Sequence, residues 1–146
     1  MRKFLKFSII GGFAALILIQ IIPYGRNHEN RAVKAEPLWD SPETRVIAKK
    51  ACFNCHSNET IWPFYSNIAP ASWLVYHDVA EAREKLNFSE WQNGKGAAEN
   101  PQLIKSMVIS GEMPPFQYTM VHPEARLTSE ERTKFVEGII KTFNQK

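Results

Sequence analysis

The 146 residues include 18 basic and 15 acidic side chains, give a formal net charge of +3, and are 44% hydrophobic. Three of the basic residues, Arg2, Lys3 and Lys6, stand at the N-terminus, so the other 15 balance the 15 acidic ones. A nucleic-acid-binding protein would carry a basic surface on its folded part. The composition therefore indicates one small globular domain and excludes a nucleic-acid partner.

Residues 1–23 predict a membrane anchor. An apolar run from Phe4 to Ile22 ends at Pro23, and a membrane-spanning helix needs roughly 20 apolar residues. A cleaved signal peptide is the alternative, but the only suitable cleavage sequence, Val33-Lys34-Ala35, lies far beyond the run and past several charges. The basic residues before the run predict a single-pass protein of the cytoplasmic membrane with its C-terminal domain outside, in the periplasm.

The remaining chain divides into a linker, residues 24–40, and a domain, residues 41–146. The linker is polar, charged and without periodicity. In the domain, apolar residues recur at helical spacing, and each such segment begins at a helix-start pattern. These patterns are Ser41-Pro42-Glu43, Pro70, Asn100-Pro101 and Thr128-Ser129-Glu130-Glu131. The alternation typical of strands does not stand out, so the predicted fold class is all-α.

The helix ends and the connecting segments can also be placed. The second helix is expected to end near Leu86, and Gly111 is expected to stop the third. The first helix should run directly into the only two cysteines, Cys52 and Cys55. The irregular segments are an aromatic loop over 58–69, a turn at Asn93-Gly94 and a long loop over 116–126.

Cys52-Phe53-Asn54-Cys55-His56 has the C-x-x-C-H pattern of covalent haem attachment. Two cysteine sulfurs bond the porphyrin vinyl groups, and the adjacent histidine offers an imidazole nitrogen to the iron. The pattern therefore predicts one covalently attached haem c, held by Cys52 and Cys55, with His56 as the proximal iron ligand.

Two other interpretations of the cysteine pair remain. A thioredoxin-like dithiol needs a βαβ context, whereas the surroundings of this pair are predicted to be helical. A zinc site needs two more ligands near His56, and the other three histidines are not paired at zinc-finger spacing. Haem is favoured over both.

The second axial ligand of haem c in an electron carrier is most often Met or His. Met113 is favoured because it lies in Gly111-Glu112-Met113-Pro114-Pro115, where prolines limit the entropy lost in holding the thioether. Met107 falls on the apolar stripe of the third helix and is expected in the core. The other candidates are His77, Met120 and His122.

The order of helix, C-x-x-C-H motif, Met-Pro loop and C-terminal helix resembles class I cytochrome c. More closely, the chain resembles the small bacterial haem-binding domain family. The shared segments are Cys52–Ser57, Trp62–Pro70, Ser72–Val75, Leu86–Trp91, Gly111–Pro115 and His122-Pro123. The resemblance implies a cytochrome c-like fold in which the first and last helices pack together, haem c binding, and Met113 as distal ligand. The 116–126 segment is longer than in ordinary class I cytochromes and carries Met120 and His122, so the distal ligand stays open.

Four aromatic side chains are candidates for a haem pocket: Trp62, Tyr65, Trp73 and Trp91. Such side chains exclude water from the iron or donate hydrogen bonds to the haem propionates. Ordinary core packing is the alternative for each.

The predicted function is electron transfer rather than enzyme catalysis. The partners would be redox proteins that the sequence does not identify, together with the membrane through the N-terminal helix. One alternative is a haem enzyme or a sensor of peroxide or nitric oxide, with an open or displaceable distal site. Another is an assembly module whose haem is structural.

Overall fold

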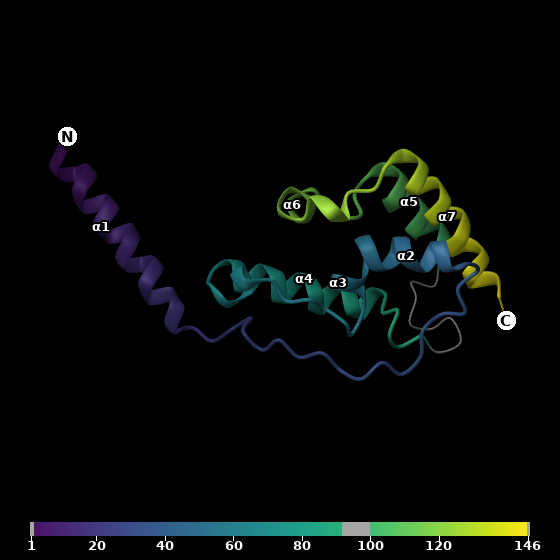
Figure 1. Cartoon of the computed structure of the whole chain (residues 1–146). Helices are drawn as coiled ribbons and strands as arrows, with labels where there is room; N and C mark the ends of the chain where they lie inside the picture. Colours follow the sequence, from purple (N-terminus) through teal and green to yellow (C-terminus); the bar gives the residue numbers. More distant parts are fainter. Residues whose placement is uncertain (1, 92–99, 146) are drawn as a thin grey trace. The chain divides into compact units, whose positions relative to one another are not determined.

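The computed structural model describes residues 2–91 and 100–145, and over these residues it is all-helical, as the sequence predicts (Figure 1). Extended pairing within them is limited to an isolated bridge between Ala35 and Glu90. The chain divides into two compact units. Unit 1 comprises Met1–Glu29 and Trp62–Asp78, and unit 2 comprises Asn30–Ile61 and Val79–Lys146. The predicted turn at Asn93-Gly94 lies outside the described residues.

Unit 2 is organised around its C-terminal helix α7. The α-helices that lie wholly within this unit are α2 (Pro42–Ala51), α3 (Phe53–His56), α5 (Pro101–Ser110), α6 (Phe116–Val121) and α7 (Ser129–Asn144). Helix α7 packs against both α5 and α2 (Figure 1). The first and last helices of the predicted domain therefore pack together, as the cytochrome c resemblance implied.

The crossing of α2 and α7 depends on Gly138. A Cβ atom at this position would collide with the side chain of Thr44 and would come 2.8 Å from Asp40 Oδ1. Thr44 is buried on α2, so the two helices approach too closely for any larger residue. The absence of a side chain at position 138 is thus a packing requirement of this fold.

One hydrophobic cluster forms the core of unit 2. Phe88, Phe135 and Ile139 are its fully buried large side chains. Burying a side chain of this size contributes about 1.5–3 kcal/mol. Phe53, inside the cysteine motif, stacks on Phe88 with ring centroids 5.5 Å apart. The core therefore holds the motif in place through the residue between the two cysteines.

The helix ends follow the predicted capping signals. Ser41 Oγ accepts the Thr44 N–H at 3.2 Å, and Asn100 Oδ1 accepts the Gln102 N–H at 2.8 Å. Thr128 forms a reciprocal capping box at the start of α7. Gly111 ends α5 with φ +84°, a left-handed conformation that favours glycine.

Residues 116–126 correct a sequence prediction. They were expected to form a loop, but they fold into α6 (Phe116–Val121) and the 3-10 helix η3 (Pro123–Ala125). A helix of six residues is too short to show an apolar stripe, so periodicity does not reveal it. A second short 3-10 helix, η2 (Phe64–Asn67), interrupts the aromatic loop.

Unit 1 contains α1 (Arg2–Leu18), η1 (Ile19–Ile21), η2 and the first half of α4 (Ala71–Lys85). The segment Lys3–Ile21 is long and apolar enough to cross a membrane, a property that it shares with signal sequences, and none of it is buried. The second predicted helix corresponds to α4, which runs to Lys85 and is followed by the buried Leu86.

Candidate haem site

The cysteine motif forms one tight helical turn. Helix α2 ends at Ala51, and α3 follows after Cys52, whose N–H donates to Ala48 O at 2.8 Å. The Cys52 carbonyl then accepts the N–H groups of Cys55, at 3.1 Å, and His56, at 2.8 Å. This turn fixes the spacing of the two thiols and of the imidazole. Both cysteines are half-buried.

The His56 imidazole is held by two backbone carbonyls. Its Nδ1 atom lies 3.2 Å from Ala82 O and 3.0 Å from Leu86 O. A carbonyl can only accept a hydrogen bond, so Nδ1 carries the proton and Nε2 keeps its lone pair. Burial lowers the pKa of His56, which favours the neutral form. Metal-binding histidines in proteins are oriented in this way.

The Cys52 side chain is a protonated thiol at neutral pH. Burial, with a smaller contribution from the Cys55 sulfur, raises the pKa of Cys52 to about 12. Within residues 2–91 and 100–145, His, Cys, Asp and Glu side chains do not assemble in groups of three or more that could hold a metal ion. The zinc alternative therefore finds no ligand set in the part of the chain that the structure describes.

Asn54, the second residue between the cysteines, ties the motif to its neighbours. Its Oδ1 accepts the Ile61 N–H at 3.0 Å, and its backbone carbonyl accepts a hydrogen bond from Thr60 Oγ1 at 2.8 Å. Its Nδ2 donates to the Tyr118 hydroxyl on α6 at 2.7 Å. The side chain of Asn54 thus connects the motif to the short helix that the sequence did not reveal.

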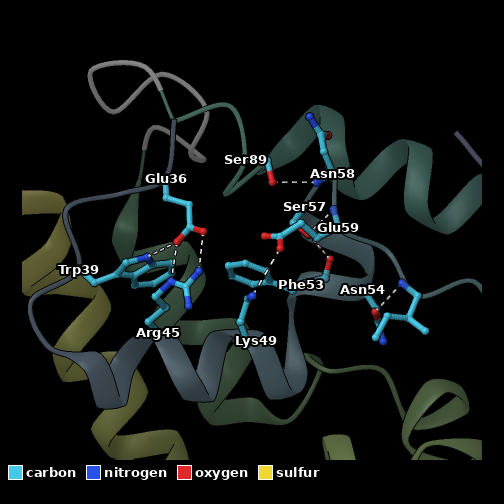
Figure 2. A network of polar contacts seen from close by, with 11 residues as sticks. Glu36, Trp39, Arg45, Lys49, Phe53, Asn54, Ser57, Asn58, Glu59 and Ser89 are labelled. Carbon is cyan, nitrogen blue, oxygen red and sulfur yellow. Dashed lines mark hydrogen bonds and ion pairs between the residues drawn. The ribbon is translucent and has the colours of Figure 1, made fainter. Parts of the chain in front are cut away.

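The residues after His56 form a buried polar network. Ser57 Oγ donates to Phe53 O at 2.7 Å and accepts the Glu59 N–H at 3.0 Å. The Asn58 N–H donates to Ser89 Oγ at 2.9 Å (Figure 2). Buried hydrogen bonds of this kind hold the backbone around His56 in one conformation.

Arg83 extends this support from α4. It donates to Ser57 O at 2.8 Å and to Thr60 Oγ1 at 2.9 Å. Ala82, one residue earlier, supplies one of the two carbonyls that fix His56. Sequence reasoning did not find these polar supports, because long-range side-chain hydrogen bonds leave no periodic signal.

An ion pair holds residues 36–39 against α2. Arg45 donates from two guanidinium nitrogens to the Glu36 carboxylate, each at 2.7 Å, and Trp39 Nε1 donates to it at 3.0 Å (Figure 2). The hydrogen bonds from Arg45 lower the pKa of Glu36. Trp39 packs against the hydrophobic cluster. Part of the predicted linker therefore contributes to the core of unit 2.

Met113 lies in the bend after α5, and both of its backbone groups are bonded. Its N–H donates to Met107 O at 3.0 Å, and its carbonyl accepts Arg132 from α7 at 3.1 Å. Arg132 also donates to Val108 O at 2.6 Å. The Met113 side chain is half-buried and packs against the hydrophobic cluster, as Cys52 does. The structure therefore places Met113 and Cys52 at the border of one core.

The other candidate distal ligands have different surroundings. Met120 on α6 is 59% exposed. His77 belongs to unit 1, is exposed, and lies 3.6 Å from the Asp78 carboxylate. His122 is half-buried, stacks on Tyr118, and has Nδ1 2.8 Å from Glu124 Oε1. Among these three side chains, only His122 combines partial burial with a carboxylate on its Nδ1 atom.

The candidate pocket aromatics separate into two groups. Trp91 belongs to unit 2, where it packs between Phe88 and Phe143. Trp62, Tyr65 and Trp73 belong to unit 1. Among the described residues the buried Trp73 Nε1 has no hydrogen-bond partner.

A neutral imidazole with a fixed Nδ1–H, placed beside two thiols in a helical unit, is suited to binding the iron of a haem. The comparison with protein families agrees with this geometry. The family described as haem-binding domain matches residues 14–141, and the chain belongs to this family. No curated protein and no solved structure matches the chain. Haem is therefore the cofactor of this protein, as the sequence predicted.

Proposed function

We propose that this protein is a monohaem electron-transfer cytochrome of the cytoplasmic membrane. Cys52 and Cys55 would attach the haem covalently, and His56 and Met113 would be the axial iron ligands. Haem supplies a one-electron iron couple when it is bound. The observation that carries the proposal is the His56 imidazole, whose Nδ1 faces two carbonyls and whose Nε2 keeps its lone pair.

The residues of the chain have distinct roles in this proposal. His56 is oriented by backbone carbonyls, which also increase the donor strength of Nε2 because they accept the Nδ1 proton. The helical turn presents Cys52 and Cys55 at a fixed spacing. Since electron transfer makes and breaks no substrate bond, the site needs no general acid or base.

The distal side is supported by the position of Met113. The Met113 N–H and carbonyl are both hydrogen-bonded, and the Met113 side chain packs against the core that Cys52 borders. A held loop of this kind favours a stable Met ligand over an open distal site. An enzyme or sensor would need that site to be open or easily displaced.

The membrane location is supported by the apolar segment Lys3–Ile21, which begins with basic residues. Retained as an anchor, it would place the haem unit outside the cytoplasmic membrane, because basic residues stay on the cytoplasmic side. The physiological partners would then be redox proteins at that surface.

Covalent attachment and redox activity test the proposal. Haem should stay with the denatured full-length protein in acidified acetone, and a Cys52→Ala, Cys55→Ala double variant should release it. The intact protein should titrate as a single reversible one-electron couple. Release of haem from the unaltered protein would refute covalent attachment, and a couple that does not reoxidise reversibly would refute electron transfer.

A further inference from the structure

The segment from Trp62 to Tyr76 has an unusual composition for this chain. These 15 residues contain no Asp, Glu, Lys or Arg, although 23% of the whole sequence is charged. They include five aromatic residues: Trp62, Phe64, Tyr65, Trp73 and Tyr76. Trp and Tyr concentrate where a membrane meets water, because their rings are apolar and their N–H or O–H groups are polar.

Three large apolar side chains of this segment face outward. Phe64 is 80% exposed, Ile68 51% and Leu74 58%. Exposed apolar groups that lie close together mark a surface that contacts another molecule or a membrane, and these three stand within one short segment of the chain. The composition and the exposure of this segment therefore point to one apolar contact surface.

Hydrogen bonds place this surface beside the end of the apolar N-terminal helix. Gln20 lies in η1, directly after α1, and its side chain bonds both backbone groups of Ala69. Its Oε1 accepts the Ala69 N–H at 3.0 Å, and its Nε2 donates to Ala69 O at 2.9 Å. Ala69 follows Ile68, so the exposed Ile68 side chain belongs to the same bend that Gln20 holds.

Two further contacts continue along the chain from this bend. Gly25 has φ +77°, and a Cβ atom there would collide with the Ser72 carbonyl. The rings of Tyr24 and Tyr76 meet edge to face with centroids 5.4 Å apart. Within unit 1, residues 20–25, which include the end of the span and the residues just after it, thus contact residues 69–76.

We propose that Trp62–Tyr76 is a membrane-docking surface on which Phe64, Ile68 and Leu74 enter the lipid leaflet where the N-terminal helix ends. The inference rests on the retained membrane anchor of the proposed function. Lipid is the occupant because the surface carries no formal charge, is rich in aromatic residues and is continuous with the membrane span. Elements of this kind lie roughly 5–10 Å deep in the interface.

The experiment uses the full-length haem-loaded protein in vesicles of phosphatidylcholine and phosphatidylglycerol. Spin labels are attached at single introduced cysteines, Phe64→Cys and Leu74→Cys, and the unaltered protein is treated in parallel to measure labelling of Cys52 and Cys55. The matched controls are Val46→Cys on α2 and Leu103→Cys on α5, both exposed apolar positions of unit 2. Phe13→Cys reports on α1.

The readout is the relaxation of each label with oxygen, which concentrates in lipid, and with a water-soluble nickel chelate. Each value is taken relative to nitrogen, which subtracts the effect of the haem iron. Oxygen should relax the labels at 64 and 74 severalfold more than the nickel chelate does. The same result is expected for the label at 13. Labels at 46 and 103 should favour nickel.

The outcomes separate the surface from the anchor. If the label at 13 is in lipid while those at 64 and 74 favour nickel, the docking surface is refuted and the anchor stands. If the label at 13 also favours nickel, both are refuted. A third outcome is that neither reagent reaches the labels at 64 and 74, and that their spectra are broadened by coupling between labels until unlabelled protein is added. In that case a second copy of the protein covers the surface, and the lipid proposal is wrong.

Discussion

The two sides of the candidate haem site are held by different means. His56 is fixed from its side chain, because two carbonyls near the end of α4 accept its Nδ1 proton. Met113 is fixed from its backbone, through Met107 and Arg132, while its side chain packs against the core. The His56 side therefore depends on an internal polar network, whereas the Met113 side depends on one arginine and on packing.

The largest effect is expected from removing the His56 imidazole. His56→Gly should abolish the six-coordinate low-spin spectrum of the reduced protein, since the proposed proximal ligand is lost, and added imidazole should restore much of it. His77→Gly, an exposed histidine of unit 1, is the control and should leave the spectrum unchanged. An unchanged spectrum in His56→Gly would show that another residue binds the iron.

The helix crossing that supports the motif should be the next most sensitive feature. Gly138→Ala forces a methyl group against Thr44, and overpacking of this kind costs about 1–3 kcal/mol. Urea unfolding followed by circular dichroism should show the loss. A Cβ atom at Gly12 in α1 would meet no other atom within 4 Å, so Gly12→Ala should cost no stability. Equal stability of the two variants would mean that α2 and α7 are not in close contact.

On the Met113 side, Arg132→Ala should loosen the distal loop. Losing a hydrogen bond from a charged donor costs about 1.5–3 kcal/mol, and 1.4 kcal/mol corresponds to about a tenfold change in equilibrium. Carbon monoxide should therefore bind the reduced variant roughly tenfold faster. The control is Lys134→Ala on the same helix, which removes only exposed ion pairs, one with Glu43 on α2 and one with Glu130 on α7. Equal rates in both variants would contradict a loop held by Arg132.

The smallest effect concerns the ion pair that fastens residues 36–39. Because Arg45 lowers the pKa of Glu36, the folded state binds fewer protons than the unfolded state near the ordinary pKa of 4.5. The contribution to stability is therefore present above that pH and is lost as the pH falls through the lowered value.

Glu36→Gln should lower the free energy of unfolding at neutral pH by at most about 1 kcal/mol, because the pair is partly exposed. The difference from the unaltered protein should vanish well below pH 4.5. The control is Glu130→Gln, which removes an exposed ion pair with Lys134 one turn further along α7. It should have less effect. A difference that persists in acid would show that the pair is not the cause.

The sequence predicts the features that have local signals. Capping residues such as Ser41 and Thr128 mark helix starts, and Gly111 marks an end, so α2, α5 and α7 are correctly placed. Periodicity fails for α6, which is shorter than two turns. It also overstates burial, since Leu103 lies on the predicted stripe of α5 but is half exposed.

The candidate site is predictable only in part, for a related reason. Cys52, Cys55 and His56 stand together in the sequence, so their pattern is visible. The carbonyls of Ala82 and Leu86 and the guanidinium of Arg132 reach the site through tertiary contacts between distant segments. A backbone carbonyl carries no residue identity, and no single-sequence pattern can indicate which one accepts a proton.

The central claim is that the iron has His56 on one side and Met113 on the other. The far-red absorption of the purified oxidised protein tests it most directly, since sulfur bound to ferric low-spin haem gives a charge-transfer band there. The band should be present in the unaltered protein and in Met120→Ala, and it should be lost in Met113→Ala. A protein without the band that binds carbon monoxide rapidly when reduced would contradict the account.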